Sequence, residues 1–288
     1  MSTSGQTYKE LALPYFKEVF DIIDKVLVKE DIPYYLIGAT AIALEFLNEG
    51  KKPPRGTRDI DFALMLSSMA EYDHIVSDLK EYGFNSVEAP WTLYHEKYDV
   101  AIDLLPFGKI EENDTESFNK RYSDLHVLGL REVLEDAIEI LIEDKVAKIP
   151  PLAGMIILKL VAWSDRPEER DNDLTDILKI IELSYEHDWD DIVESHFDLL
   201  DQLDETAGQL KISARVLGRK AREYLLKSET LSNRILSLME EQLSNADSSG
   251  IARQWALSKD IDLELAMAIL KEFETGLKED GGLFWIRG

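Results

Sequence analysis

The chain has 288 residues, of which 32 are Lys or Arg and 57 are Asp or Glu, so its formal net charge is −25 with histidine neutral. Hydrophobic residues make up 45% of the sequence, which is enough apolar material for a packed core and argues against global disorder. The negative charge disfavours non-specific DNA binding, because a broad basic surface supplies most of that affinity. The lack of cysteine excludes disulfides and thiolate metal sites and fits a reducing cytoplasm.

Targeting and membrane signals are missing from the sequence. The N-terminus lacks the basic start and apolar core of a secretory signal. No apolar run reaches the roughly 18 residues that span a bilayer. The longest run, residues 152–163, is followed by Ser164-Asp165-Arg166. We therefore expect a cytoplasmic protein with no membrane-spanning segment, and the length allows about two domains.

The first part of the chain alternates helix and strand patterns. Apolar residues at helical spacing predict a helix over residues 15–30, which ends before Pro33. The predicted elements that follow are a strand at 34–37, a helix at 41–47 after a break at 38–40, a loop at 51–58, a strand at 60–66, a helix at 69–82, and strands at 91–95 and 98–105.

The second part of the chain is mainly helical in pattern. A polar stretch at 109–124 is followed by predicted short strands at 138–143 and 145–149, helices at 151–164 and 173–187, further helices to about 278, and a loop at 247–250. This order predicts an α+β fold: a mixed β-sheet with flanking helices in residues 1–150, followed by a helical domain in residues 151–288.

Two carboxylates lie close together at the start of the predicted strand 60–66. Residues two apart on a strand point to the same face, so Asp59 and Asp61 are expected side by side. Asp103 interrupts an apolar strand, where an unpaired carboxylate would be costly. If the two strands are neighbours, three carboxylates converge, and Mg²⁺ is the natural partner of such oxygen ligands. Alternatively, Asp59 ends a loop and Asp61 faces solvent on an edge strand.

Gly38 and Thr40 belong to a turn between a predicted strand and a predicted helix. A glycine there lets the backbone approach a phosphate, the helix N-terminus supplies N–H groups, and the Thr40 hydroxyl adds a donor. An ordinary strand–helix turn explains the same residues.

A third group of charged residues begins at Lys159. On a helix, Arg166 follows on roughly the same side two turns later. Two cations facing an acidic metal site would suit a triphosphate, which Arg can bind bidentately. The alternative is a set of surface ion pairs among Asp165, Arg166, Glu169 and Arg170.

One basic cluster stands out in the acidic helical half. It consists of Arg215, Arg219, Lys220 and Arg222. The cluster could receive an RNA end, or it could form a solvated helix face that pairs with the abundant Glu and Asp residues.

Taken in order, these segments resemble the polymerase-beta-type nucleotidyltransferase superfamily, in which a glycine-containing strand–helix turn precedes a DxD strand and a third carboxylate on a neighbouring strand. The similarity is greatest to the AbiEii/AbiGii group of type IV toxin–antitoxin systems, which is related to mycobacterial toxins that modify tRNA. It covers about residues 32–180 and rests on the segments YLIGATAIALEF, RGTRDIDFAL, VAIDLLPFG and LKLVAWSDR, the last followed by RDNDLTDI.

The resemblance implies a nucleotidyltransferase-like sheet and assigns roles to single residues. Asp59, Asp61 and Asp103 would be catalytic and would hold Mg²⁺. The implied nucleotide-binding residues are Gly38, Thr40, Lys159, Arg166, Asp173 and Asp176. The last two match the group's terminal acidic pair, which can also be aligned through Asp171.

The activity implied by the resemblance is two-metal transfer of an NMP from an NTP to a hydroxyl of an RNA, such as a tRNA, or of a protein. The enzyme would be the toxin of a pair with a cognate antitoxin. Ala39 stands where the group usually has a second glycine or a serine. This favours an alternative, a catalytically idle nucleotidyltransferase fold that senses nucleotides or binds a protein.

Overall fold

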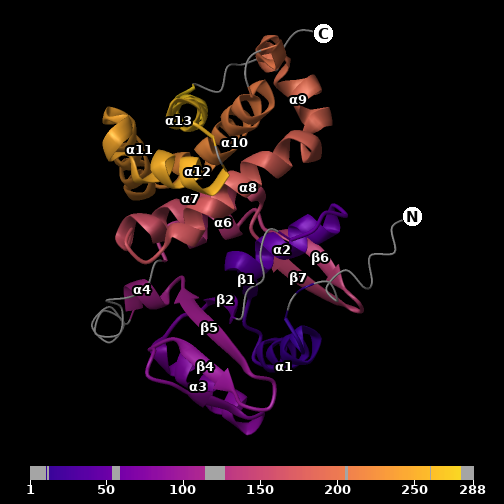
Figure 1. Ribbon diagram of the computed structural model, residues 1–288. Helices are drawn as coiled ribbons and strands as arrows, with labels where there is room; N and C mark the ends of the chain where they lie inside the picture. Colours follow the sequence, from indigo (N-terminus) through magenta and orange to yellow (C-terminus); the bar gives the residue numbers. More distant parts are fainter. Residues whose placement is uncertain are drawn as a thin grey trace. The chain divides into compact units, whose positions relative to one another are not determined.

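The computed structural model describes residues 11, 13–53, 59–113, 127–204, 207–259 and 261–279. The chain divides into two compact units, Met1–Pro151 and Leu152–Gly288 (Figure 1). We refer to them as the N-terminal and the C-terminal unit and describe each by itself.

The N-terminal unit is built on a mixed sheet with the strand order β1-β2-β5-β4-β3. Its strands are β1 (Tyr34–Ile37), β2 (Asp59–Met65), β3 (Phe84–Ser86), β4 (Thr92–His95) and β5 (Val100–Phe107). β2 and β5 are parallel, and the other neighbouring strands are antiparallel. A separate antiparallel hairpin consists of β6 (Ile138–Ile142) and β7 (Lys145–Ile149). The α+β fold class is confirmed, whereas β3 was not predicted because three residues are too few to show an alternating pattern.

The helices α1 and α3 lie on one face of this sheet. The helices of the unit are α1 (Phe16–Lys29), α2 (Gly38–Asn48), α3 (Met69–Glu81), α4 (Ile110–Asn113) and α6 (Leu130–Leu134). The Phe20 ring of α1 lies 6.3 Å from the Tyr34 ring, which lies 6.3 Å from the Phe62 ring of β2. α1 therefore packs on the face that carries Phe62, and α3 lies against α1. Because successive strand residues alternate, the residues on either side of Phe62 point to the opposite face.

The start of α2 differs from the prediction. The helix begins at Gly38 instead of Ala41, directly after β1. Ile37 keeps an extended conformation at the N-cap, and Gly38 turns the chain with a φ of 65°. Glycine adopts this left-handed conformation without the penalty that a Cβ brings, so the strand passes into the helix without a loop.

The C-terminal unit is helical, as predicted. It contains α7 (Leu152–Asp165), α8 (Asp171–His187), α9 (Trp189–Ser195), η3 (Phe197–Asp204), α10 (Gly208–Lys227), α11 (Glu229–Ser244), η4 (Ala246–Ser248), α12 (Gly250–Lys259) and α13 (Leu263–Lys278). The loop predicted at 247–250 lies between α11 and α12, where residues 246–248 form a short 3₁₀ turn and α12 begins at Gly250. α7 ends at Asp165, so Arg166 does not continue its face, because Pro167 disfavours a helical conformation for the residue before it.

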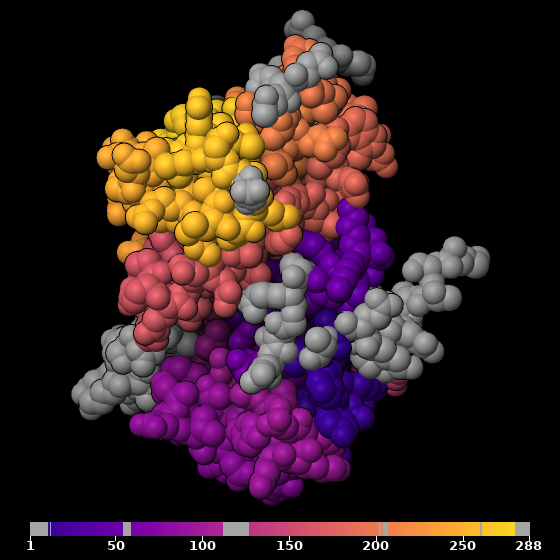
Figure 2. Space-filling model, in the orientation of Figure 1, coloured from indigo at the N-terminus to yellow at the C-terminus, as the bar shows by residue number. Residues whose placement is uncertain are grey.

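Close helix packing organises this unit. α10 and α13 meet at Gly218 and Gly276, where a Cβ added to Gly276 would lie 2.2 Å from the Arg215 carbonyl oxygen. The buried Trp255 indole of α12 donates a 2.8 Å hydrogen bond to the Leu174 carbonyl of α8. In the space-filling view the late helices, orange to yellow, form a continuous packed surface (Figure 2). None of the helices in the described residues combines the length and apolar character needed to cross a membrane.

Candidate active site

The three predicted carboxylates lie on two neighbouring parallel strands. In the register of β2 and β5, Asp61 is the direct partner of Asp103, and Asp59 is the partner of Ala101. Because registered partners point to the same face, all three carboxylates lie on the face opposite Phe62. Asp59 is exposed, and Asp61 and Asp103 are half-buried. β2 lies between β1 and β5, so the alternative of an edge strand is wrong.

Gly38 lies directly against the Asp61 carboxylate. A Cβ added to Gly38 would be 2.0 Å from Asp61 Oδ2 and 2.9 Å from Asp61 Cγ. Both the left-handed backbone and this close approach require glycine. The space next to the α carbon, which the sequence suggested for a phosphate, is occupied by Asp61. Gly38 thus lets the first turn of α2 lie beside the acidic face.

Thr40 is fully buried in α2. Its hydroxyl donates a 3.3 Å hydrogen bond to the backbone carbonyl of Asp59. In this structure the side chain therefore connects α2 to the first residue of β2. Its assignment to the nucleotide stays a prediction.

Thr92 is the polar residue at this face that sequence reasoning missed. It lies on β4 directly opposite Asp103, and its hydroxyl donates a 2.5 Å hydrogen bond to Asp103 Oδ1. One row across the sheet thus runs from Ile37 through Asp61 and Asp103 to Thr92. The alternation of Thr92-Leu93-Tyr94-His95 could have placed Thr92 on a polar face, but nothing in the sequence pairs it with Asp103.

The chemistry of this donor set fits Mg²⁺. All candidate ligands are oxygens, and two carboxylates in direct register repel each other unless a cation lies near them. Among the residues that the structure describes, the three aspartates do not form a group whose ligand atoms all lie within 4.8 Å of one another. The three carboxylates therefore share one face of two neighbouring strands, but their oxygens do not yet surround a single metal position.

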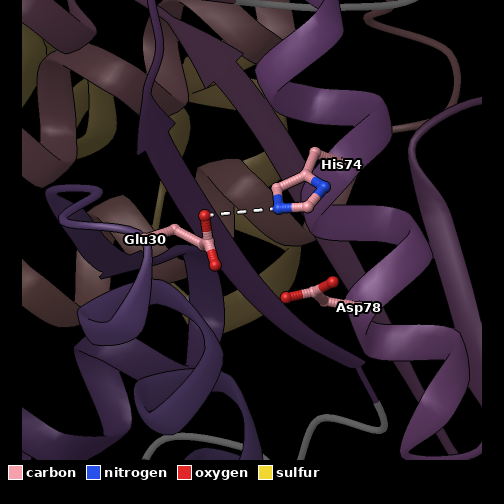
Figure 3. Close-up of side chains that lie close together, drawn as sticks. All are labelled: Glu30, His74 and Asp78. Carbon is pink, nitrogen blue, oxygen red and sulfur yellow. Dashed lines mark ion pairs between the residues drawn. The ribbon is translucent and has the colours of Figure 1, made fainter.

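Another group of possible metal ligands lies elsewhere in the N-terminal unit (Figure 3). His74 and Asp78 are one turn apart on α3, and His74 Nε2 lies 3.3 Å from Glu30 Oε2, beyond the end of α1. Lys29 Nζ lies 2.8 Å from Glu30 and 2.9 Å from Asp78. Its hydrogen bonds lower the pKa of both the Glu30 and the Asp78 carboxyl group. Lys29, a cation of the chain itself, already lies between the two carboxylates and offsets part of their charge, so we assign no metal to this group.

In the C-terminal unit, Lys159 is buried between two carboxylates of α8. Its Nζ donates to Asp173 Oδ1 at 2.7 Å and to Asp176 Oδ2 at 2.8 Å. Burial lowers the pKa of Lys159, but the two carboxylates outweigh burial and raise it above its ordinary value. Arg170 also donates to Asp173, at 3.3 Å. The predicted acidic pair and the predicted lysine thus form one buried ion triad that joins α7 to α8.

Several other cations of this unit also have carboxylate neighbours. Arg166 lies 3.6 Å from Glu169. In the basic cluster, Arg215 pairs with Glu272 and Glu279, Arg219 with Asp198 and Glu279, and Lys220 with Asp188 and Asp191. These pairs match the ion-pair interpretation of the cluster. The structure gives no support to an RNA-binding role for these three cations.

Comparisons with known proteins add little to this geometry. No family model matches the chain, and no curated protein matches it. Among solved structures, a CCA-adding enzyme of Thermotoga maritima complexed with tRNA is similar, with 12% identity over 96% of this chain and 84% of that chain and a TM-score of 0.26. A likeness at this TM-score carries no argument, so the functional conclusion rests on the residues.

Proposed function

We propose that the protein is a Mg²⁺-dependent nucleotidyltransferase that moves an NMP from an NTP to a hydroxyl group. The single observation that carries this proposal is the direct register of Asp61 with Asp103 on neighbouring parallel strands, with Asp59 on the same face. Carboxylate oxygens that share one face of two neighbouring strands are the ligands that a divalent cation such as Mg²⁺ prefers.

In the proposed mechanism Asp59, Asp61 and Asp103 hold the metal. Mg²⁺, when bound, supplies the positive charge that offsets the developing charge of the triphosphate. Asp103 Oδ2, the oxygen that does not accept from Thr92, takes the proton of the attacking hydroxyl. The hydroxyl oxygen bonds to the α-phosphorus while the bond to the α–β bridging oxygen breaks, and pyrophosphate leaves.

The other predicted site residues keep supporting roles in this proposal. The N–H groups in the first turn of α2, at Gly38, favour phosphate oxygens near Asp61. The Lys159, Asp173 and Asp176 triad holds α7 against α8 and so shapes the segment that carries Arg166. Arg166 is the proposed triphosphate contact, because a guanidinium group can bind phosphate oxygens bidentately.

The acceptor and the biological role come from the resemblance to the AbiEii/AbiGii group. We propose a hydroxyl of an RNA, with a protein hydroxyl as the other outcome, and a cytoplasmic toxin that a cognate antitoxin silences. Expression of the chain in a bacterial host should then slow growth, and Asp61→Ala should abolish that effect. Growth arrest that persists with Asp61→Ala would contradict a toxin role based on this site.

The activity is tested by incubating the protein with each labelled NTP, Mg²⁺, and either total RNA or total protein. We expect label in one macromolecular fraction with the wild type and at least a thousandfold less with Asp61→Ala, because the metal-binding charge provides most of the rate enhancement. Asp73→Ala, an exposed aspartate of α3, is the matched control and should keep activity. Undiminished transfer by Asp61→Ala would refute the site.

The same protein tests the idle-fold alternative. Mg²⁺ with an NTP should raise the melting temperature if the site binds its substrates. Absence of both transfer and a thermal shift with all four NTPs would favour a protein-binding module.

A further inference from the structure

Two neighbours flank the pair of registered carboxylates from opposite sides. Asp61 lies against the Gly38 backbone, where a Cβ would be 2.0 Å from its Oδ2. Asp103 accepts the Thr92 hydroxyl at Oδ1 from the other side, at 2.5 Å. Each carboxylate thus has its own specific contact: Asp61 has a steric contact with Gly38, and Asp103 accepts a hydrogen bond from Thr92.

The backbone explains why Thr92 reaches Asp103. The Leu104 N–H donates a 2.9 Å hydrogen bond to the Trp91 carbonyl, so Trp91 and Leu104 occupy a hydrogen-bonded position of the antiparallel β4–β5 pair. The next pair along, Thr92 with Asp103, therefore falls at a non-hydrogen-bonded position, where opposite side chains approach more closely. Thr92 is β-branched and has few χ1 choices on a strand, so its hydroxyl is held in a defined direction.

We propose that Thr92 is a positioning residue for the metal-binding carboxylate of Asp103, an inference that rests on the proposed function. The hydroxyl has one proton, and donating it to Oδ1 fixes the rotation of the carboxylate. The second oxygen, Oδ2, does not accept from Thr92 and would be the one to take the proton of the attacking hydroxyl. Outer partners that orient a metal ligand typically change metal affinity by about 10–100-fold when removed.

The test measures Mn²⁺ binding to the protein without nucleotide, by electron paramagnetic resonance of the free ion. Thr92→Val keeps the shape of the side chain but removes the hydroxyl, and it should weaken Mn²⁺ binding about 10-fold. Thr92→Ser returns the donor and should bind within about 3-fold of the wild type. Thr275→Val removes a hydroxyl that donates to the Lys271 carbonyl within its own helix, α13, and it is the matched control expected to leave Mn²⁺ binding unchanged.

The Mg²⁺ dependence of nucleotide transfer gives a second readout, which would not change if Thr92 had only a structural role. Thr92→Val should lower kcat at saturating NTP and raise the Mg²⁺ concentration needed for half-maximal rate, with an unchanged KM for NTP at saturating Mg²⁺. If Thr92→Val unfolds the chain, Thr92→Ala and Thr92→Ser are compared in the same way.

The outcomes separate this inference from the proposed function. Wild-type Mn²⁺ affinity in Thr92→Val, together with lost affinity in Asp103→Asn, would overturn the role of Thr92 alone. Mn²⁺ binding that depends on Asp61, Asp103 and Thr92 without any nucleotide transfer would overturn the proposed reaction but support the inference. Mn²⁺ binding indifferent to Asp61 and Asp103 would overturn both.

Discussion

The acidic face of the sheet and the helical C-terminal unit differ in how their charged side chains are arranged. On the sheet, β2 and β5 align Asp61 with Asp103, so that carboxylate stands beside carboxylate. In the helices, charges meet their opposites, as Lys159 does between Asp173 and Asp176. Carboxylates that share one face of a sheet favour the binding of a cation, whereas opposite charges in contact offset the cost of burial. The first arrangement suits binding, and the second suits structure.

The largest expected effect concerns the buried triad. Lys159→Met should lower the free energy of unfolding by about 3–5 kcal/mol, because it removes the buried cation that hydrogen-bonds both the buried Asp176 and the half-buried Asp173. Chemical denaturation measures this loss. Arg166→Met is the matched control and should cost less than about 0.5 kcal/mol, since the half-buried Arg166 lies 3.6 Å from the exposed carboxylate of Glu169. If Lys159→Met instead weakened NTP binding and left stability unchanged, Lys159 would belong to the binding region.

The second prediction compares two glycines, Gly38 at the start of α2 and Gly50 just after its end. Gly38 has a φ of 65° and Gly50 a φ of 69°, so an alanine strains the backbone equally at both positions, by about 1 kcal/mol. The added Cβ meets Asp61 at Gly38 but no described residue within 4 Å at Gly50. Gly38→Ala should therefore lower nucleotide transfer about 100-fold, which corresponds to about 2.7 kcal/mol, and Gly50→Ala should leave it unchanged. Equal activities of the two variants would show that contact with Asp61 does not matter.

The sequence could predict those features of the acidic face that depend on neighbouring residues, but not those that depend on contacts between distant segments. The spacing of Asp59 and Asp61 and the apolar strand around Asp103 indicated an acidic site, because a strand alternates with period two. The register that joins β2 to β5, and β4 to β5 through Thr92, depends on pairing between distant segments, which no local pattern specifies. The sequence therefore indicated the carboxylates but not the neighbour that holds one of them.

The ion pairs of the helical unit show the same limit. Lys159 finds its carboxylates on the next helix, and Arg219 finds Asp198 and Glu279 far away in the sequence. Helical spacing alone predicted Lys159 and Arg166 on one face, but α7 ends at Asp165, so the helix on which that spacing depends does not include Arg166. Helices were predictable from periodicity, but the partners of their charges depend on tertiary packing.

The third prediction concerns the crossing of α10 and α13. Gly276→Ala should lower the free energy of unfolding by about 2 kcal/mol, because its Cβ would meet backbone atoms that cannot rotate away. The distances are 2.2 Å to the Arg215 carbonyl oxygen and 2.8 Å to the Arg219 nitrogen. Thr275→Ala, one residue away, loses only a hydrogen bond within its own helix and should cost about 0.5 kcal/mol or less. Equal losses in the two variants would mean that the helices can separate freely.

The smallest expected effect is a pH dependence in the same helices. Burial raises the pKa of Glu279, but hydrogen bonds from Arg219 and Arg215 outweigh burial and hold that pKa below its ordinary value of 4.5. A carboxyl group whose pKa is lowered by folding contributes stability above the unfolded pKa and loses it as the pH falls through the folded pKa. Glu279→Gln should therefore lower stability by about 1 kcal/mol, or roughly 3 °C in Tm, near neutral pH.

Thermal unfolding followed from about pH 7 to about pH 3 tests that expectation. The difference in Tm between wild type and Glu279→Gln should stay constant down to about pH 5 and then shrink, because the wild-type carboxyl becomes protonated and loses its ion pairs. Glu240→Gln, an exposed position on α11, should differ little from wild type at any pH. A difference that persists undiminished at pH 3 would mean that Glu279 stabilises the α10–α13 contact through its shape and not through its charge. The contrast between a binding face of like charges and a structural region of opposite charges would then fail at this pair.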